Sequence, residues 1–162
     1  QVPRLLSESL RDNILLGSPE QEEELVRALH LAVMEHDLPT LERGLDTMIG
    51  PRGVKLSGGQ VQRTAAARML VREAELYVCD DLSSALDVET ENALWDRVFA
   101  KRRGAFLVVS HRRPALQRAD QIIVLDDGRI VEAGTHDQLV AGGGTYSGIH
   151  RRQTLTSELD EI

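Results

Sequence analysis

The feature that most constrains the fold is a strand, helix, strand order in the second half of the chain. Two short apolar runs, Leu76–Cys79 and Phe106–Val109, each end at polar residues. A helical pattern from Val88 to Lys101 separates them. A helix between two apolar strands is typical of a parallel pair that is buried by helices. The sequence therefore predicts an α/β fold.

Beyond this unit the sequence predicts a hairpin and two short helices. The turn signal Asp126-Asp127-Gly128 lies between two strand-like runs, so the sheet is expected to end in an antiparallel pair. Further upstream, Ser18 and Pro19 are typical of a helix start, and apolar residues recur at helical spacing from Glu20 to Glu35. The remaining expected segments are strands at Gln121–Leu125 and Arg129–Glu132, helices at Gly59–Val71, Thr135–Val140 and Tyr146–Gln153, and a disordered tail at 154–162.

A glycine pair stands where the helix of the alanine-rich segment begins, in the run Leu56-Ser57-Gly58-Gly59-Gln60. Backbone N–H groups at a helix N-terminus are unpaired and the helix dipole is positive there, so an anion fits such a site. Ser57 can add a hydroxyl donor. The alternative interpretation is a glycine-rich loop that caps an ordinary helix.

Two carboxylates end the first apolar strand, at Asp80 and Asp81. The C-terminal end of a buried parallel strand is where α/β sheets bind ligands. Asp80 is placed to hold Mg²⁺ through oxygen ligation, and Asp81 to orient or deprotonate an attacking water. An ordinary acidic turn between strand and loop is the alternative.

Two further groups of polar residues stand out, one directly after Asp81 and one at the end of the second apolar strand. The run Ser83-Ser84-Ala85-Leu86-Asp87 comes directly after the carboxylates and also fits a serine N-cap for the next helix. The second strand ends in Ser110-His111, and a histidine there can donate a hydrogen bond to a γ-phosphate. A lone histidine is more often structural.

Charge and composition exclude several classes of protein. The formal net charge is -7, with 26 acidic and 19 basic residues, which argues against a nucleic-acid partner bound through its phosphates. The longest apolar runs are far shorter than the roughly 20 residues that cross a bilayer. A single cysteine, Cys79, fits a reducing compartment.

In this order the motifs resemble the ATP-binding-cassette (ABC) ATPase family, over nearly the whole chain. Leu56–Gln60 is similar to the signature motif, Leu76–Asp81 to the Walker B segment, and His111 to the switch histidine. Ser84, Ala85, Leu86 and Asp87 are similar to the D-loop, and Gln1 to the Q-loop glutamine. The runs that resemble the exporter branch are Val2–Ser9, Asn13–Gly17 and Gly128–His136.

The resemblance implies a partial P-loop NTPase fold, with a helical signature subdomain at about 14–72 and a core part at 73–153. It implies ATP and Mg²⁺ as ligands, with Asp80 and Gln1 on the metal and Asp81, His111 and Gln1 in catalysis. Each ATP in this family lies between the Walker A motif of one subunit and the signature of the other. A second ABC ATPase domain and a transmembrane exporter domain are therefore the implied partners, and the implied location is the cytoplasmic face of the membrane.

The sequence departs from the family in two places. No run fits the Walker A pattern G-x-x-x-x-G-K-[ST], since the only lysines are Lys55 and Lys101 and neither follows a glycine in that arrangement. The family has this element before its Q-loop, so a truncation is expected, and the isolated chain is expected to be inactive or very weak on ATP. The absent part would cover the strand of Val78, so apolar surface is expected to be exposed there and the isolated chain to self-associate. Asp81 also stands where the family usually has glutamate, which shortens the arm of the base.

The resemblance implies an energy-coupling fragment of an ABC exporter. The alternative function is a free-standing small protein on the same scaffold without ATPase activity. In that alternative, Asp80 and Asp81 with His111 bind another metal, Cys79 is reactive, or the protein works by self-assembly.

Overall fold

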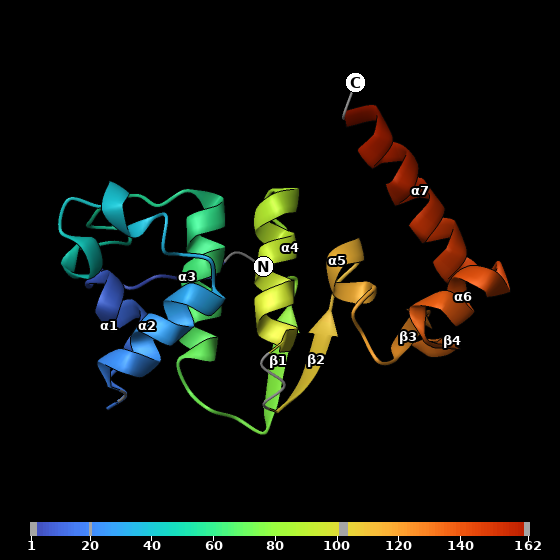
Figure 1. Ribbon diagram of the computed structural model, residues 1–162, viewed down its shortest axis with the longest axis horizontal. Coiled ribbons are helices and arrows are strands. Elements are labelled where there is room, and N and C mark those ends of the chain that lie inside the picture. The colour runs from blue at the N-terminus through green and yellow to red at the C-terminus, as the bar shows by residue number, and fades with distance from the viewer. Residues whose placement is uncertain (1–2, 20, 101–103, 161–162) are drawn as a thin grey trace. The chain divides into compact units, whose positions relative to one another are not determined.

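The computed structural model describes residues 3–19, 21–100 and 104–160 (Figure 1). The chain divides into two compact units, Gln1–Val109 and Ser110–Ile162. Among the described residues, no helix combines the length and the apolar character needed to span a membrane.

The first unit begins with three α-helices: α1 (Leu10–Leu15), α2 (Glu22–Leu31) and α3 (Gly58–Leu70). Two short 3₁₀ helices, η1 (Leu38–Thr40) and η2 (Gly44–Asp46), lie in the connection between α2 and α3. Both α1 and α2 pack against α3. Their shared core consists of fully or nearly fully buried side chains, among them Leu10, Ile14, Leu25, Ala28, Ala66 and Ala67.

The start and end of α2 differ from the prediction. The helix begins after Gln21, which forms a capping box with Glu24, and not after Ser18. Reciprocal side-chain bonds at Gln21 satisfy the free N–H groups of the first turn, so this residue outcompetes the Ser-Pro signal. At the other end Val33 has a φ of 57°, which ends the helix before the predicted Glu35.

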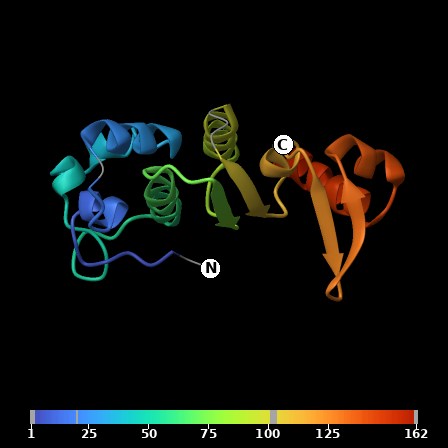
Figure 2. The same cartoon turned by 90° about the horizontal axis from the view of Figure 1, so that it is seen from below.

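The predicted parallel pair is confirmed. Strand β1 (Leu76–Asp80) pairs with β2 (Ala105–Val109), and their register runs from Leu76 opposite Ala105 to Asp80 opposite Val109. Helix α4 (Val88–Ala100) lies between them in sequence and covers one side of the pair (Figure 2). Ring contacts hold helix and sheet together: Tyr77 stacks on Phe106 at 4.8 Å between centroids, and Phe106 meets Phe99 of α4 edge to face at 5.6 Å.

The other side of the strand pair is an exposed apolar face, in agreement with the apolar surface expected around Val78. Exposure is 59% at Val78 and 56% at Leu107, and Leu76 and Val109 of the same face are exposed to a similar degree. Alternate residues of a strand point to opposite faces, so these four side chains share one face. Exposed apolar sheet surface of this kind promotes association.

Substituting both Val78 and Leu107 by threonine should reduce self-association of the isolated chain and its binding of a hydrophobic dye. Threonine has the β-branched shape that suits a strand, and it is more polar than valine or leucine because it carries a hydroxyl. Light scattering and dye fluorescence measure the two effects. Val88→Thr is the matched control, because Val88 is 65% exposed but lies on α4. A parent chain that is monomeric and binds no dye would contradict the prediction.

The second unit contains α5 (Arg113–Leu116), β3 (Ile122–Asp126), β4 (Arg129–Gly134), α6 (His136–Gly142) and α7 (Thr145–Asp160). The predicted antiparallel hairpin is confirmed, and Asp127 and Gly128 at its turn both have positive φ. A small core gathers Ile122, Leu139 and Tyr146.

Two features of this unit complete its description. Within the described residues β3 and β4 form a two-stranded sheet. Helix α7 continues to Asp160, where a disordered tail was predicted from residue 154. The tail is rich in polar residues, but it continues a helix that already has its first turns packed, and propagation of a helix is easier than its initiation.

Candidate functional site

The glycine pair opens helix α3, and Ser57 is its N-cap. The backbone N–H of Gln60 donates to Ser57 Oγ at 3.2 Å, and the N–H of Ser57 donates to Gln60 Oε1 at 2.9 Å. This capping box confirms the interpretation of Ser57 as a cap. It leaves the anion site open as well, because a hydroxyl that accepts a hydrogen bond can still donate one. Ser57 and Gly58 are exposed.

An ion pair fixes the first turn of α3 to the segment that follows α2. The Arg63 guanidinium donates to both oxygens of Asp37 at 2.8 to 3.0 Å, and both side chains are only 13% exposed. Gln60 Nε2 also donates to Asp37 Oδ1, at 3.2 Å. Bidentate pairing of arginine with a carboxylate is directional, so it holds the helix start in one orientation. Asp37 was not among the residues singled out from the sequence.

The carboxylates at the end of β1 differ in their surroundings. Asp80 is exposed and Asp81 is half-buried. Asp81 has a φ of 52°, and its N–H donates to the carbonyl of Val109 at 2.9 Å, which extends the parallel ladder by one residue. Its Oδ1 atom is buried, with no hydrogen-bond partner among the described residues. Buried polar atoms normally have partners, so this oxygen is available for a ligand.

These two carboxylates fit a magnesium ion that is held with a nucleotide. Mg²⁺ prefers oxygen ligands and is usually bound through one or two carboxylates together with substrate phosphates. Asp80 and Asp81 supply hard oxygens at adjacent positions, and Asp81 Oδ1 has no hydrogen-bond partner among the described residues. No group of three or more His, Cys, Asp and Glu side chains suited to a metal occurs in the described part of the chain.

The predicted D-loop lies against the start of α3, and Gln62 joins the two. Gln62 Oε1 accepts from the N–H of Ala85 at 2.7 Å, and Gln62 Nε2 donates to Ser84 Oγ at 2.6 Å. The same nitrogen lies 3.4 Å from the carbonyl oxygen of Asp81. A Cβ added to Gly59 would lie 3.2 Å from the carbonyl oxygen of Ala85, so glycine permits this close approach.

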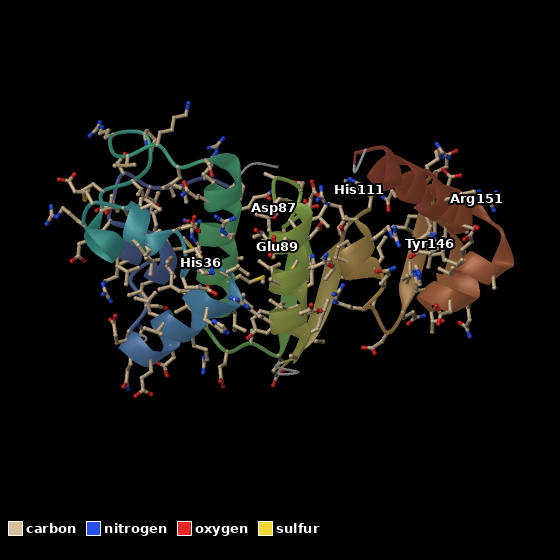
Figure 3. The ribbon with its side chains drawn as sticks, turned by 45° about the horizontal axis from the view of Figure 1, so that its top comes forward. His36, Asp87, Glu89, His111, Tyr146 and Arg151 are labelled. Carbon is tan, nitrogen blue, oxygen red and sulfur yellow. The ribbon has the colours of Figure 1, made fainter. Side chains whose placement is uncertain are left out.

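A second set of bonds anchors the D-loop to α4. Thr90 donates from its N–H and its hydroxyl to the two Asp87 oxygens at 2.9 and 2.8 Å. These bonds lower the pKa of Asp87, and its position at the start of α4 is seen in Figure 3. Asp87 therefore takes the capping role that the sequence assigned to a serine. Ser83 is buried and donates to Glu91 Oε1 at 2.5 Å, while Trp95 Nε1 donates to Ser83 Oγ at 3.3 Å.

The sequence also singled out Gln1, His111 and Cys79, which belong to neither the helix start nor the D-loop. Gln1 lies outside the described residues. His111 belongs to the second unit, where it is exposed and its carbonyl accepts from Gln153 Nε2. Cys79 is 2% exposed, and burial raises the pKa of its thiol to about 11. Little thiolate is present at neutral pH, so a reactive Cys79 is not supported.

The predicted signature, D-loop and second carboxylate are thus neighbours in the first unit. Leu56 is 9% exposed and Leu86 is 5% exposed, so these two anchor their motifs in the core. Sequence reasoning missed Asp37 and Gln62. For Gln62 a signal existed, because it lies two residues after the glycine motif; Asp37 is 26 residues from Arg63 and no local pattern marks it.

Comparisons with known proteins find relatives that are named as transport proteins. No protein-family model matches the chain. The ATP-dependent lipid A-core flippase of Vibrio vulnificus (strain CMCP6) is 40% identical over 156 residues, which cover 94% of this chain and 27% of the flippase. A Staphylococcus aureus (strain NCTC 8325 / PS 47) protein named for multidrug export as an ATP-binding/permease protein is 40% identical over 154 residues, 93% of this chain and 26% of that protein.

A solved structure agrees with the fold. A bacterial Atm1-family ABC exporter with ATP bound matches 94% of this chain with a TM-score of 0.87 and 34% identity, over 27% of its own length. The chain thus spans about a quarter of the length of the relatives it matches. Sequence and structure comparisons together show that the homologues of this chain, over 94% of its length, are ABC exporters.

Proposed function

We propose that this chain is part of the ATP-driven energy-coupling domain of an ABC exporter and supplies its signature, Walker B segment, D-loop and switch histidine. The observation that carries the proposal is the packing of the Ser57–Gln60 helix start against the D-loop, next to an Asp81 oxygen that has no protein partner among the described residues. The two relatives support it, because one is named an ATP-dependent flippase and the other a multidrug export ATP-binding/permease protein.

The chain's own nucleotide site would use the end of β1. Asp80 would hold Mg²⁺, which would neutralise charge on the phosphates of ATP. Asp81 would orient the attacking water and accept its proton. His111 would donate a hydrogen bond to the γ-phosphate, and Gln1, by the resemblance alone, would contact the metal and the water.

The helix start of α3 would serve a second nucleotide, held by the partner ATPase domain. Ser57 would donate from its hydroxyl, and the backbone N–H groups of Gly58 and Gly59 would point to the phosphates at the positive end of the helix dipole. Leu56 and Gln60 hold this turn in place, the first by burial and the second by its bonds to Ser57 and Asp37. In a head-to-tail dimer the chain therefore contributes to two ATP sites.

The proposed assembly follows from the contribution of this chain to two ATP sites. Two ATPase domains would close on ATP and reopen after hydrolysis, and a transmembrane exporter domain would follow the motion. The domain would lie at the cytoplasmic face of the membrane. Walker A would come from sequence beyond this chain, which has no such run.

Asp81→Glu should raise hydrolysis at the chain's own site about tenfold, because a carboxylate one methylene longer reaches the water better. The affinity for ATP should change little, since the base acts mainly in the transition state. The measurement uses a chimera of the Vibrio vulnificus flippase in which this chain replaces its matching 156 residues. Single-turnover hydrolysis is recorded with one or the other site disabled by a Walker A lysine substitution.

Ser57→Ala is the companion variant in the same chimera. It should impair the partner's site and leave the chain's own site active, which is the opposite pattern to Asp81 variants. A chimera that folds and binds its partner but hydrolyses no ATP at either site would contradict the proposed function. An Asp81→Glu variant no faster than the parent would contradict the idea that the shorter carboxylate limits the rate.

A further inference from the structure

We propose that Gln62 is a positioning residue that couples the two nucleotide sites to which this chain contributes. The inference rests on the proposed function and goes one step further. Gln62 lies outside both the signature and the D-loop, and it fixes the position of one relative to the other. A movement at one ATP site would therefore displace groups at the other.

The contacts of Gln62 reach both sites. Its backbone belongs to the first turns of α3, directly after the residues proposed to face the partner's ATP. Its side chain ends at the D-loop, on the Ala85 N–H and the Ser84 hydroxyl, and close to the carbonyl of Asp81. Asp81 carries the carboxylate proposed to act on the water of the chain's own site. One side chain therefore joins the supports of two different ATP molecules.

The chemistry of this position calls for a primary amide. The D-loop presents a donor, the Ala85 N–H, and acceptors, the oxygens of Ser84 and Asp81, to the same side chain. Only the amide of Gln or Asn offers an acceptor and two donors at one end. Gln62 is 6% exposed, so water cannot easily replace these bonds when they are lost.

The surrounding packing makes the connection stiff. A Cβ on Gly58 would lie 3.5 Å from Ala85 Cβ, and Gly59 approaches the Ala85 carbonyl more closely still. Asp37 also holds the helix start, through its ion pair with Arg63 and its hydrogen bond from Gln60. A displacement of the α3 start therefore moves the D-loop with it, and the amide of Gln62 is the polar link that transmits it.

The test compares Gln62→Met with Gln62→Glu in the flippase chimera, in mixed dimers that leave one active site at a time. Methionine has a similar length but removes the amide, and glutamate keeps the acceptor for the Ala85 N–H. Gln62→Met should lower single-turnover hydrolysis at both sites, by about fivefold or more, the size expected for losing buried hydrogen bonds. Gln62→Glu keeps the acceptor for the Ala85 N–H but loses the donor to Ser84, so its rates at both sites should lie between those of Gln62→Met and the parent.

The controls separate positioning from simple destabilisation. Gln121→Met makes the same change at an exposed position and should leave both rates unchanged. Leu94→Ala, in the buried face of α4, should lower the melting temperature more than Gln62→Met does, without lowering both single-turnover rates fivefold. A Gln62→Met loss confined to one site, or matched by Leu94→Ala, overturns the inference.

Hydrogen exchange of the chain itself decides the inference independently of ATP. In Gln62→Met the Ala85 amide should exchange faster, and so should the amides of Gln60 and Val61, which are bonded to Ser57, while Gln121→Met changes none of them. If Ala85 is unaffected, or if Ala85 responds and the Gln60 and Val61 amides do not, Gln62 does not couple the loop to the helix start. An inactive chimera with the expected exchange pattern would contradict the proposed function and leave the coupling standing.

Discussion

Asp80→Ala should lower ATP hydrolysis at this chain's own site by at least about 100-fold, because the proposed metal ion contributes several kcal/mol to the transition state. The side chain is exposed at the end of β1, so its removal should cost little folding stability. The measurement is single-turnover hydrolysis in the flippase chimera across a range of Mg²⁺ concentrations. The rate should remain low even at high Mg²⁺ if the carboxylate also orients the ion.

Asp126→Ala is the matched control. Asp126 is also an exposed aspartate at the end of a strand, β3, but it enters a hairpin turn. It should leave the rate and its Mg²⁺ dependence unchanged. An Asp80→Ala variant within a fewfold of the parent at ordinary Mg²⁺ would show that Asp80 does not hold the ion.

Trp95→Ala should destabilise the first unit by about 3–5 kcal/mol, a large share of the roughly 5–15 kcal/mol typical of a domain. Trp95 has no exposed surface, and its ring stacks on Phe99 at 5.3 Å between centroids. The truncation leaves a cavity and removes the donor that reaches Ser83 Oγ. Urea unfolding followed by circular dichroism measures the loss.

Two substitutions bracket this effect. Trp95→Phe keeps much of the ring volume and should cost less than Trp95→Ala, the difference reporting the cavity. Val88→Ala changes an exposed residue of the same helix and should stay within about 0.5 kcal/mol. A Trp95→Ala unfolding free energy within 1 kcal/mol or so of the parent would contradict the tight packing described around Ser83.

The elements with a strong local pattern could be predicted from the sequence. The predicted bounds of all four strands agree with the structure to within a residue or two. The apolar runs indicated β1 and β2, and the Asp-Gly turn indicated β3 and β4. The start of α3 was also predicted closely, because glycines after a serine mark a helix N-terminus. In each case the pattern and the physical cause lie within a few residues of each other.

The misses depend on long-range partners or on competing local signals. No sequence pattern near Asp37 indicates that it binds Arg63 and Gln60, since these contacts depend on how the segment before α3 folds back onto the start of that helix. At α2 two capping signals competed, and the reciprocal one at Gln21 prevailed.

The left-handed backbone at Asp81 also has a consequence for substitution at this residue. Aspartate and asparagine tolerate positive φ better than longer side chains, so an acidic residue with a short arm suits this turn. Glutamate at the same position would reach the water better, but its backbone would be more strained at this positive φ. Under the role proposed for Asp81, substitution at this residue would trade backbone stability against hydrolysis at the chain's own site.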